Sequence, residues 1–89
     1  MTRGWEADRS SPLVRRLGKS PTDLGTTGGE QGCPDIWELE NGDIAVVGRD
    51  LTDSYLPSLP PGLVIAPDER IVVIPRRTAA AAKEDLPDA

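Results

Sequence analysis

The clearest hydrophobic pattern in the chain consists of two apolar-rich runs, at 36–40 and 43–48, separated by Asn41-Gly42. Asn-Gly tolerates the positive φ angles of a two-residue type I′ turn, which joins two antiparallel strands. Such a turn fixes which residues face one another, because successive side chains of a strand point to opposite faces. The residues expected on the core face of this hairpin are Leu39, Ile44, Trp37 and Val46.

A second pair of apolar runs lies at 63–66 and 70–74, with Pro67-Asp68-Glu69 between them. Pro and Asp favour a turn, and the β-branched residues of both runs favour strands. Neither run alternates with polar residues, so both faces of these strands need burial. The sequence therefore predicts a second hairpin with more apolar surface than so short a chain can cover.

Short helices are expected on either side of this second hairpin. Residues 51–56 suit a single helical turn, which Pro57 ends. Thr78 precedes four alanines and is expected to be the N-cap of a C-terminal helix. The small side chains of that helix allow it to lie close to a sheet.

Residues 1–32 have the composition of a disordered tail, with a glycine-rich segment at 25–29. Such a segment buries too little apolar surface to offset the entropy of ordering. The segment 11–18 carries an N-cap, a Pro and a Gly stop, which favour a transient helix of about two turns. Plain disorder of this segment is the alternative.

The expected fold is mainly β: a small antiparallel sheet of two hairpins, about four strands, with a short C-terminal helix. The expected organisation is a disordered N-terminal tail at 1–32, a small β domain at 33–84 and a frayed C-terminus at 85–89.

Composition makes the core of this domain small. The 89 residues include nine Gly, nine Pro, three aromatic residues, one Cys and no His. Below roughly 70–80 residues a single core rarely supplies more than about 3–5 kcal/mol. Neither an internal disulfide nor a zinc site is available, and no cofactor is expected. A protein partner or a second copy, as in a homodimer, is therefore the expected source of further buried area.

The net charge of −5 is distributed unevenly. Residues 1–31 hold five basic and four acidic side chains, whereas residues 32–89 hold five basic and eleven acidic ones. Phosphate repels such an acidic region, so direct nucleic-acid binding by the β domain is not expected, although the Arg-bearing tail is an open alternative. No apolar run approaches the ~20 residues of a membrane span, and the first residues lack the apolar core of a signal peptide. A cytoplasmic protein is expected.

Catalytic chemistry has little support in the sequence. The carboxylates around the first turn are expected to be solvated, without the cleft that a glycosidase-like pair needs. Cys33 has no His to activate it and is expected to be a half-buried residue at the start of a strand. The glycine-rich segment lacks the Lys of a P-loop. A non-enzymatic protein is therefore the expectation.

Two arginine-containing segments, Gly48-Arg49-Asp50 and Pro75-Arg76-Arg77, each follow an expected strand. Their guanidinium groups suit the polar rim of an apolar interface, and the alternative is an internal ion pair plus an exposed basic pair. A small accessory enzyme or ligand-binding protein that uses Arg49 and Asp50 is the second functional reading. The candidate interaction residues are Trp37, Arg49, Asp50, Val64, Val73, Arg76 and Arg77.

The segments 33–39, 41–50 and 68–77 resemble small uncharacterised proteins of actinobacteria and, more distantly, the BldB-like family of small actinobacterial developmental regulators. The residues that match the family pattern are Cys33, Gly42, Val47, Arg49 and Asp50. Gly48 is inserted between the Val and the Arg, and alanines replace the aromatic residue of the family's closing helix. The resemblance implies a regulatory protein that binds other proteins, with a helix-turn-helix regulator as a possible partner.

Overall fold

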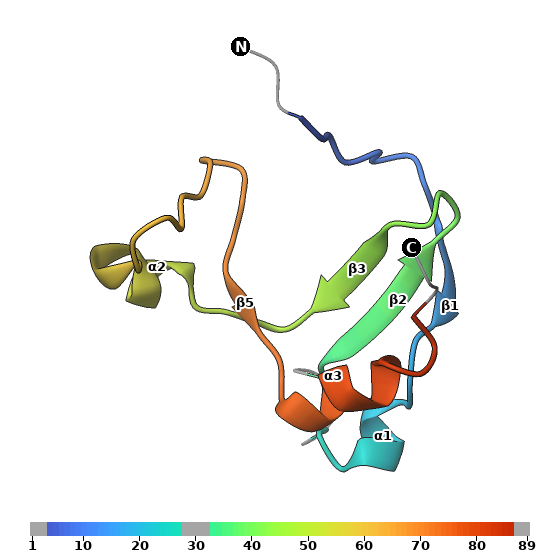
Figure 1. The fold of residues 1–89 in the computed structure, drawn as a ribbon. Helices are drawn as coiled ribbons and strands as arrows, with labels where there is room; N and C mark the ends of the chain where they lie inside the picture. Colours follow the sequence, from blue (N-terminus) through green and yellow to red (C-terminus); the bar gives the residue numbers. More distant parts are fainter. Residues whose placement is uncertain (1–3, 28–32, 87–89) are drawn as a thin grey trace.

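A computed structural model describes residues 4–27 and 33–86. It is a small mixed α/β fold with two antiparallel sheets, a three-stranded one in the order β1-β2-β3 and a two-stranded one of β4 and β5 (Figure 1). The strands are β1 (Leu13–Arg16), β2 (Asp35–Leu39), β3 (Ile44–Val47), β4 (Arg49–Asp50) and β5 (Val72–Val73). The helices are α1 (Pro21–Leu24), α2 (Thr52–Tyr55), the 3-10 helix η1 (Leu56–Ser58) and α3 (Arg76–Ala82). The antiparallel sheets and the C-terminal helix confirm those parts of the expected fold.

The N-terminal part of the chain corrects the expectation. Leu13–Arg16 form β1, an antiparallel neighbour of β2, and α1 follows. The expected disorder is therefore wrong from β1 through α1, and so is the transient helix over 11–18. Residues 1–3 and 28–32 of the expected tail lie outside the described residues.

The pairing of β1 comes from β2 rather than from the local sequence. The backbone N–H of Leu17 donates to the carbonyl oxygen of Ile36 at 2.8 Å, directly after β1. Arg15 forms an ion pair with Glu38 of β2 at 2.8 Å. A two-turn helix is marginal in isolation, whereas the edge of an existing strand offers a row of backbone partners. Pairing with β2 is therefore more favourable for this segment than a short isolated helix.

The first hairpin forms, but its register is shifted by one residue from the expected one. Trp37 pairs with Ala45, and not with Val46. The loop has three residues, with the N–H of Gly42 donating to the carbonyl of Leu39 at 2.9 Å and a φ of +91° at Gly42. Because no described residue other than glycine has a positive φ, the two-residue type I′ turn is excluded, and a type I turn followed by a left-handed glycine replaces it.

This shift exchanges the two faces of β2, while Ile44 and Val46 of β3 remain on the expected face. Ile36 lies on the core face, where only 6% of its surface is exposed, and Val46 shares that face. Trp37 lies on the opposite face, half-buried, with the Arg16 guanidinium 5.0 Å from its ring centroid. The expected core face is therefore wrong for Trp37 and Leu39 of β2, but not for Ile44 and Val46 of β3.

The core is small and lies between β2 and the helices α1 and α3. It consists of Leu17, Ile36 and Ala82, with Ile74 packed against them. Gly18 brings α3 close: with φ at +82°, a Cβ built on it would lie 2.7 Å from the Ala81 carbonyl carbon. The alanine-rich helix thus packs tightly, as expected, but its N-cap is Pro75 rather than Thr78, which is buried within the helix.

The second hairpin does not form as expected. The turn is present, since the N–H of Glu69 donates to the carbonyl of Ala66 at 3.0 Å. Residues 63–66 are not a strand, however, and β5 pairs with β4 instead, Arg49 opposite Val73 and Asp50 opposite Val72. A helical turn occurs near the expected place as α2, and η1 carries the chain through Pro57.

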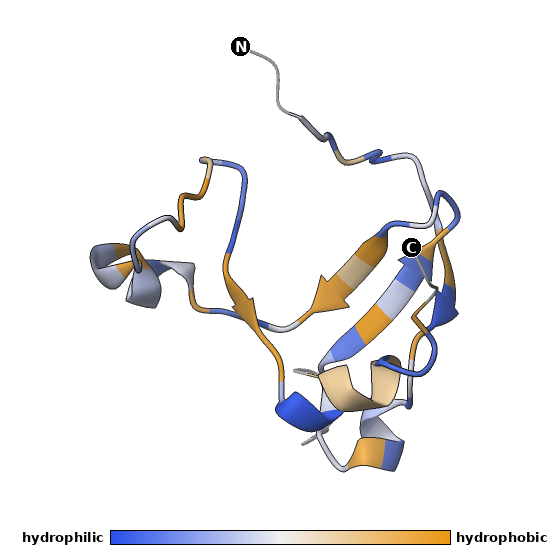
Figure 2. Cartoon of the chain, viewed as in Figure 1, coloured by the Kyte–Doolittle hydropathy of each residue, from blue (hydrophilic) through white to orange (hydrophobic). Residues whose placement is uncertain are grey.

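Two regions result. We call β1–β3 with α1 and α3 the sheet unit, and residues 49–73 the arm. The arm extends away from the sheet unit, and Figure 2 shows hydrophobic residues along β5 and in the loop of the arm.

Candidate interaction surface

The arm exposes most of its apolar side chains. Thr52 is its one buried residue, with 2% of its surface exposed. By contrast, Val64 is 85% exposed. The other large apolar residues that the arm leaves exposed are Tyr55, Leu56, Leu63, Val72 and Val73. The arm therefore has no hydrophobic core of its own.

Polar contacts hold the arm in shape. The Thr52 hydroxyl donates to Asp50 Oδ1 at 2.7 Å and accepts from the N–H of Ile71 at 2.7 Å. Arg70 forms an ion pair with Asp50 Oδ2 at 3.0 Å. Hydrogen bonds from Thr52, reinforced by Arg70, hold the pKa of the Asp50 carboxyl below its usual value. The Asp50 carboxylate is thus engaged in folding the arm.

An apolar groove of about 610 Å³ lies where the arm joins the sheet unit. Its lining residues are Thr26, Cys33, Pro34, Val47, Gly48, Arg49, Val73, Ile74 and Pro75. Gly48 permits the close approach of β5, because a Cβ built on it would lie 2.6 Å from the Val73 carbonyl oxygen. Arg49 is the one charged residue in this lining, and it forms no ion pair with any described residue.

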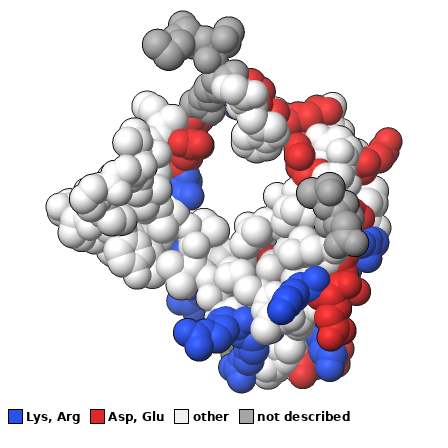
Figure 3. All heavy atoms as spheres, in the orientation of Figure 1, with Lys and Arg blue, Asp and Glu red and all other residues white. Residues whose placement is uncertain are grey.

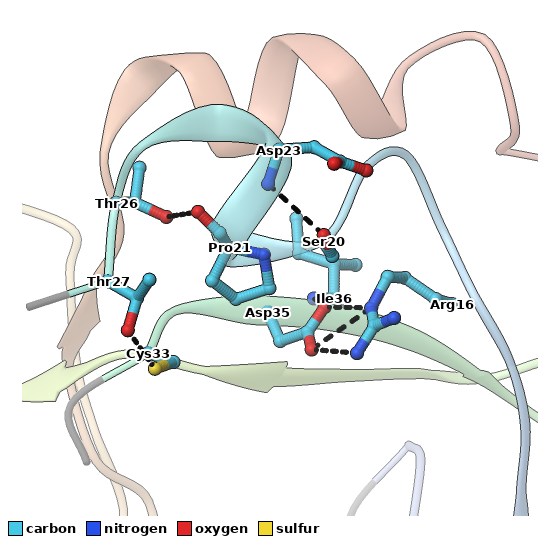
Figure 4. A network of polar contacts seen from close by, with 9 residues as sticks. All are labelled: Arg16, Ser20, Pro21, Asp23, Thr26, Thr27, Cys33, Asp35 and Ile36. Atoms are coloured by element: carbon cyan, nitrogen blue, oxygen red, sulfur yellow. Dashed lines mark hydrogen bonds and ion pairs between the residues drawn. The ribbon is translucent and has the colours of Figure 1, made fainter. Parts of the chain in front are cut away.

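One wall of the groove is tied to a polar network around α1 (Figure 4). The Cys33 thiol and the Thr27 hydroxyl lie 2.8 Å apart, and Cys33 is half-buried, as the sequence predicts. Ser20 caps α1 by accepting from the N–H of Asp23 at 3.2 Å. The Thr26 hydroxyl donates to the carbonyl of Pro21 at 3.4 Å. These contacts position the wall of the groove.

Arg16 and Asp35 form a bidentate ion pair in the same network, with Nη2 to Oδ2 at 2.9 Å and Nε to Oδ1 at 3.0 Å. Burial acts to raise the pKa of Asp35, but hydrogen bonds from Arg16 and Trp37 outweigh it and leave that pKa below its usual value. The same pairing raises the pKa of Arg16. Arg16 also lies over the Trp37 ring, so these contacts indicate a structural role for Trp37.

The structure brings some of the candidate residues together and separates others. Arg49 and Val73 line the groove, and Arg76 and Arg77 directly follow Pro75 at its edge. The candidates that do not themselves line the groove are Trp37, Asp50, Val64, Arg76 and Arg77, and of these the two arginines lie next to it in sequence.

Sequence reasoning missed Val47 and Thr26 as groove residues. Val47 was not among the residues expected on the core face of the first hairpin, and Thr26 lies in the segment expected to be disordered. The apolar character of Val47 at the end of a strand was the one available signal.

Charge is also segregated across the surface. Basic side chains gather near the start of α3, and acidic side chains gather around the β2–β3 turn (Figure 3). Within residues 4–27 and 33–86, no three His, Cys, Asp or Glu side chains come together as metal ligands. Nor does any helix of this part of the chain have the length and apolarity to cross a bilayer.

The features of the surface are therefore an exposed apolar arm, an apolar groove whose Arg49 has no ion pair within residues 4–27 and 33–86, and segregated charge. Compared with known proteins, the chain matches no family model, no curated protein and no solved structure.

Proposed function

We propose that the chain is a non-enzymatic protein-interaction module with a regulatory role. The observation that carries this proposal is the apolar surface of the arm, where Val64 is 85% exposed and no buried apolar residue lies beneath it. The chain exposes 6973 Å², whereas a folded monomer of this mass exposes roughly 5000 Å². A partner that covers the arm would bury part of this surplus.

The groove indicates which kind of partner segment fits this surface. Its apolar lining with Arg49 at the side corresponds to the usual anatomy of an interface, an apolar centre with an Arg-containing rim. Arg76 and Arg77 extend the positive charge along one edge. A partner segment with apolar and acidic side chains suits this arrangement.

The regulatory part of the proposal draws on the resemblance to the BldB-like regulators, carried by 33–39, 41–50 and 68–77. By that resemblance a helix-turn-helix regulator is the candidate protein partner. The second reading, a ligand site at Arg49 and Asp50, has less support, because the Asp50 carboxylate is occupied by Thr52 and Arg70 and does not line the groove.

Affinity capture from the native cell tests the proposal, with Val64→Ser compared against Val14→Ser. Val14 is also an exposed apolar residue, at 51%, but it lies in the sheet unit. We expect Val64→Ser to reduce the captured proteins, quantified by mass spectrometry, about ten-fold, as for an interface hot spot, and Val14→Ser to leave them unchanged. Equal capture by both variants and the wild type contradicts a role for the arm.

A further inference from the structure

The outer edge of β3 has no backbone partner among residues 4–27 and 33–86. In the order β1-β2-β3, the neighbour that this part of the chain gives to β3 is β2. The N–H of Leu39 donates to the carbonyl of Asp43 at 2.8 Å, which makes this a hydrogen-bonded pair. Such pairs alternate along an antiparallel ladder, so Ala45 and Val47 also face β2. The N–H and C=O groups of Ile44 and Val46 therefore point to the open edge.

This edge lacks the features that usually prevent strand pairing. Natural edge strands carry a Lys, a Pro or a bulge, whereas β3 reads Ile44-Ala45-Val46-Val47. Val46 is 42% exposed and Val47 53% exposed. On this side of β3 the space-filling view shows an opening between the sheet unit and the arm (Figure 3).

We propose that a second copy of the chain pairs with this edge, β3 against β3 in antiparallel orientation. The inference goes beyond the proposed function: it adds a second interface, separate from the arm, at which the partner is a copy of the chain itself. An antiparallel pair of identical strands is isologous, so each contact occurs twice. The hydrogen-bonding groups meet only in registers that differ by steps of two residues, because Ile44 and Val46 must face outward-pointing residues of the second copy.

Charge selects one of these registers. With Val46 opposite the second copy's Val46, Ala45 faces Val47 and Asp43 faces Arg49. Arg49 forms no ion pair among the described residues, and the Asp43 carboxylate contacts Asn41 but no basic side chain. The Val46-centred register therefore supplies both unpaired charges with partners, twice over. A slip by two residues places Asp43 against an apolar residue instead.

Sedimentation equilibrium of the purified full chain is the first test. The contact is small, so we expect a reversible dimer with a micromolar dissociation constant. Val46→Pro removes an outward N–H without touching the β2–β3 ladder, and we expect it to weaken the dimer by at least about ten-fold. Val64→Ser, in the arm, is the control and is expected to leave dimerisation unchanged. A wild-type chain that stays monomeric up to several hundred micromolar overturns the inference, as does a dimer indifferent to Val46→Pro.

A charge exchange tests the register. Arg49→Glu places like charges opposite one another in a homodimer, and so does Asp43→Arg, so each variant alone is expected to dimerise about five-fold more weakly. A mixture of the two variants restores opposite charges at both positions, and heterodimers with wild-type affinity are expected. A mixture that associates no better than the single variants overturns this register.

These results separate the inference from the proposed function. A monomeric chain that still loses captured proteins through Val64→Ser keeps the interaction role of the arm and rejects the β3 dimer. If the chain forms the β3 dimer and Val64→Ser does not reduce the captured proteins, the dimer is supported and the role of the arm is rejected.

Discussion

The sheet unit and the arm use similar apolar residues but are stabilised differently. In the sheet unit Leu17, Ile36 and Ala82 are almost fully buried between β2 and the helices. In the arm the buried residue is Thr52, and it acts through its hydroxyl. The sheet unit is thus held by hydrophobic burial, which many contacts share, and the arm by a few hydrogen bonds. The arm is accordingly expected to open locally at lower free energy than the sheet unit.

Each region also depends on a glycine at a close backbone contact. Gly18 meets α3 in the sheet unit, and Gly48 meets β5 at the base of the arm. Because the two contacts are similar in kind but different in place, substitution of each glycine separates the two regions experimentally.

The largest effect is expected for Gly18→Ala. The residue has a φ of +82°, and the new Cβ would lie 2.7 Å from the backbone of both Ala81 and Ala82. Backbone strain and loss of α3 packing together are expected to cost about 3 kcal/mol or more, most of the stability of so small a domain. Thermal unfolding followed by circular dichroism measures this. Gly25→Ala is the control, since Gly25 shares the positive φ but has nothing within 4 Å, and should cost only about 1 kcal/mol.

Gly48→Ala is expected to affect the arm more than the sheet unit. The new Cβ would lie 2.6 Å from the Val73 carbonyl oxygen, so β5 must shift, at a cost of about 2 kcal/mol. Amide hydrogen exchange should then accelerate at Leu51 and Ile71, whose N–H groups bond across the arm, while Leu17 in the sheet unit keeps its protection. Equal acceleration at all three amides would show that the two regions unfold as one.

A smaller effect, confined to the arm, is expected for Thr52→Val. This change keeps the shape of the side chain but removes the hydroxyl that binds Asp50 and Ile71, leaving the half-buried N–H of Ile71 without this partner. The expected cost is about 1–3 kcal/mol. Thr52→Ser retains the hydroxyl and is the matched control. Limited proteolysis of the arm should increase for the Val variant only; cleavage rates that are the same for both variants would assign Thr52 a packing role.

The same contrast explains which features the sequence could predict. The turn at 66–69 and the helical turn near Thr52 depend on residues adjacent in sequence, and both occur close to their expected places. The register of the first hairpin depends on whether Asn41 adopts a positive φ, which its residue type permits but does not require. One residue of error there exchanged Trp37 and Ile36 between the faces.

Strand pairings between segments far apart in the sequence could not be predicted from local sequence patterns. β1 forms because β2 offers an edge, and β5 pairs with β4 across the whole arm rather than with 63–66. In the groove, the two candidate residues that were identified, Arg49 and Val73, follow or end apolar strands, while Thr26 had no local signal.

The smallest expected effect is the loss of folding stability at low pH. It acts on the two regions through different carboxylates. Asp35 in the sheet unit and Asp50 in the arm each have a pKa lowered from 3.8 in the folded chain. A carboxyl whose folded pKa is depressed contributes stability that is fully present above its unfolded pKa and is lost as the pH falls through the folded value. Stability should therefore be flat at neutral pH and should decline below about pH 4.

Asp35→Asn and Asp50→Asn assign this decline to the two regions. The Asp35 side chain is 14% exposed and holds Arg16 with two bonds, whereas the Asp50 side chain is 48% exposed. We therefore expect Asp35→Asn to lower the melting temperature at pH 6 by roughly 2–5 °C and to flatten its pH dependence, with a smaller change for Asp50→Asn. Melting curves at pH 3 and pH 6 provide the measurement. If Asp50→Asn flattens the profile more, the ion pair of the arm stabilises the whole chain, and the division into a hydrophobic sheet unit and a polar arm does not describe its cooperativity.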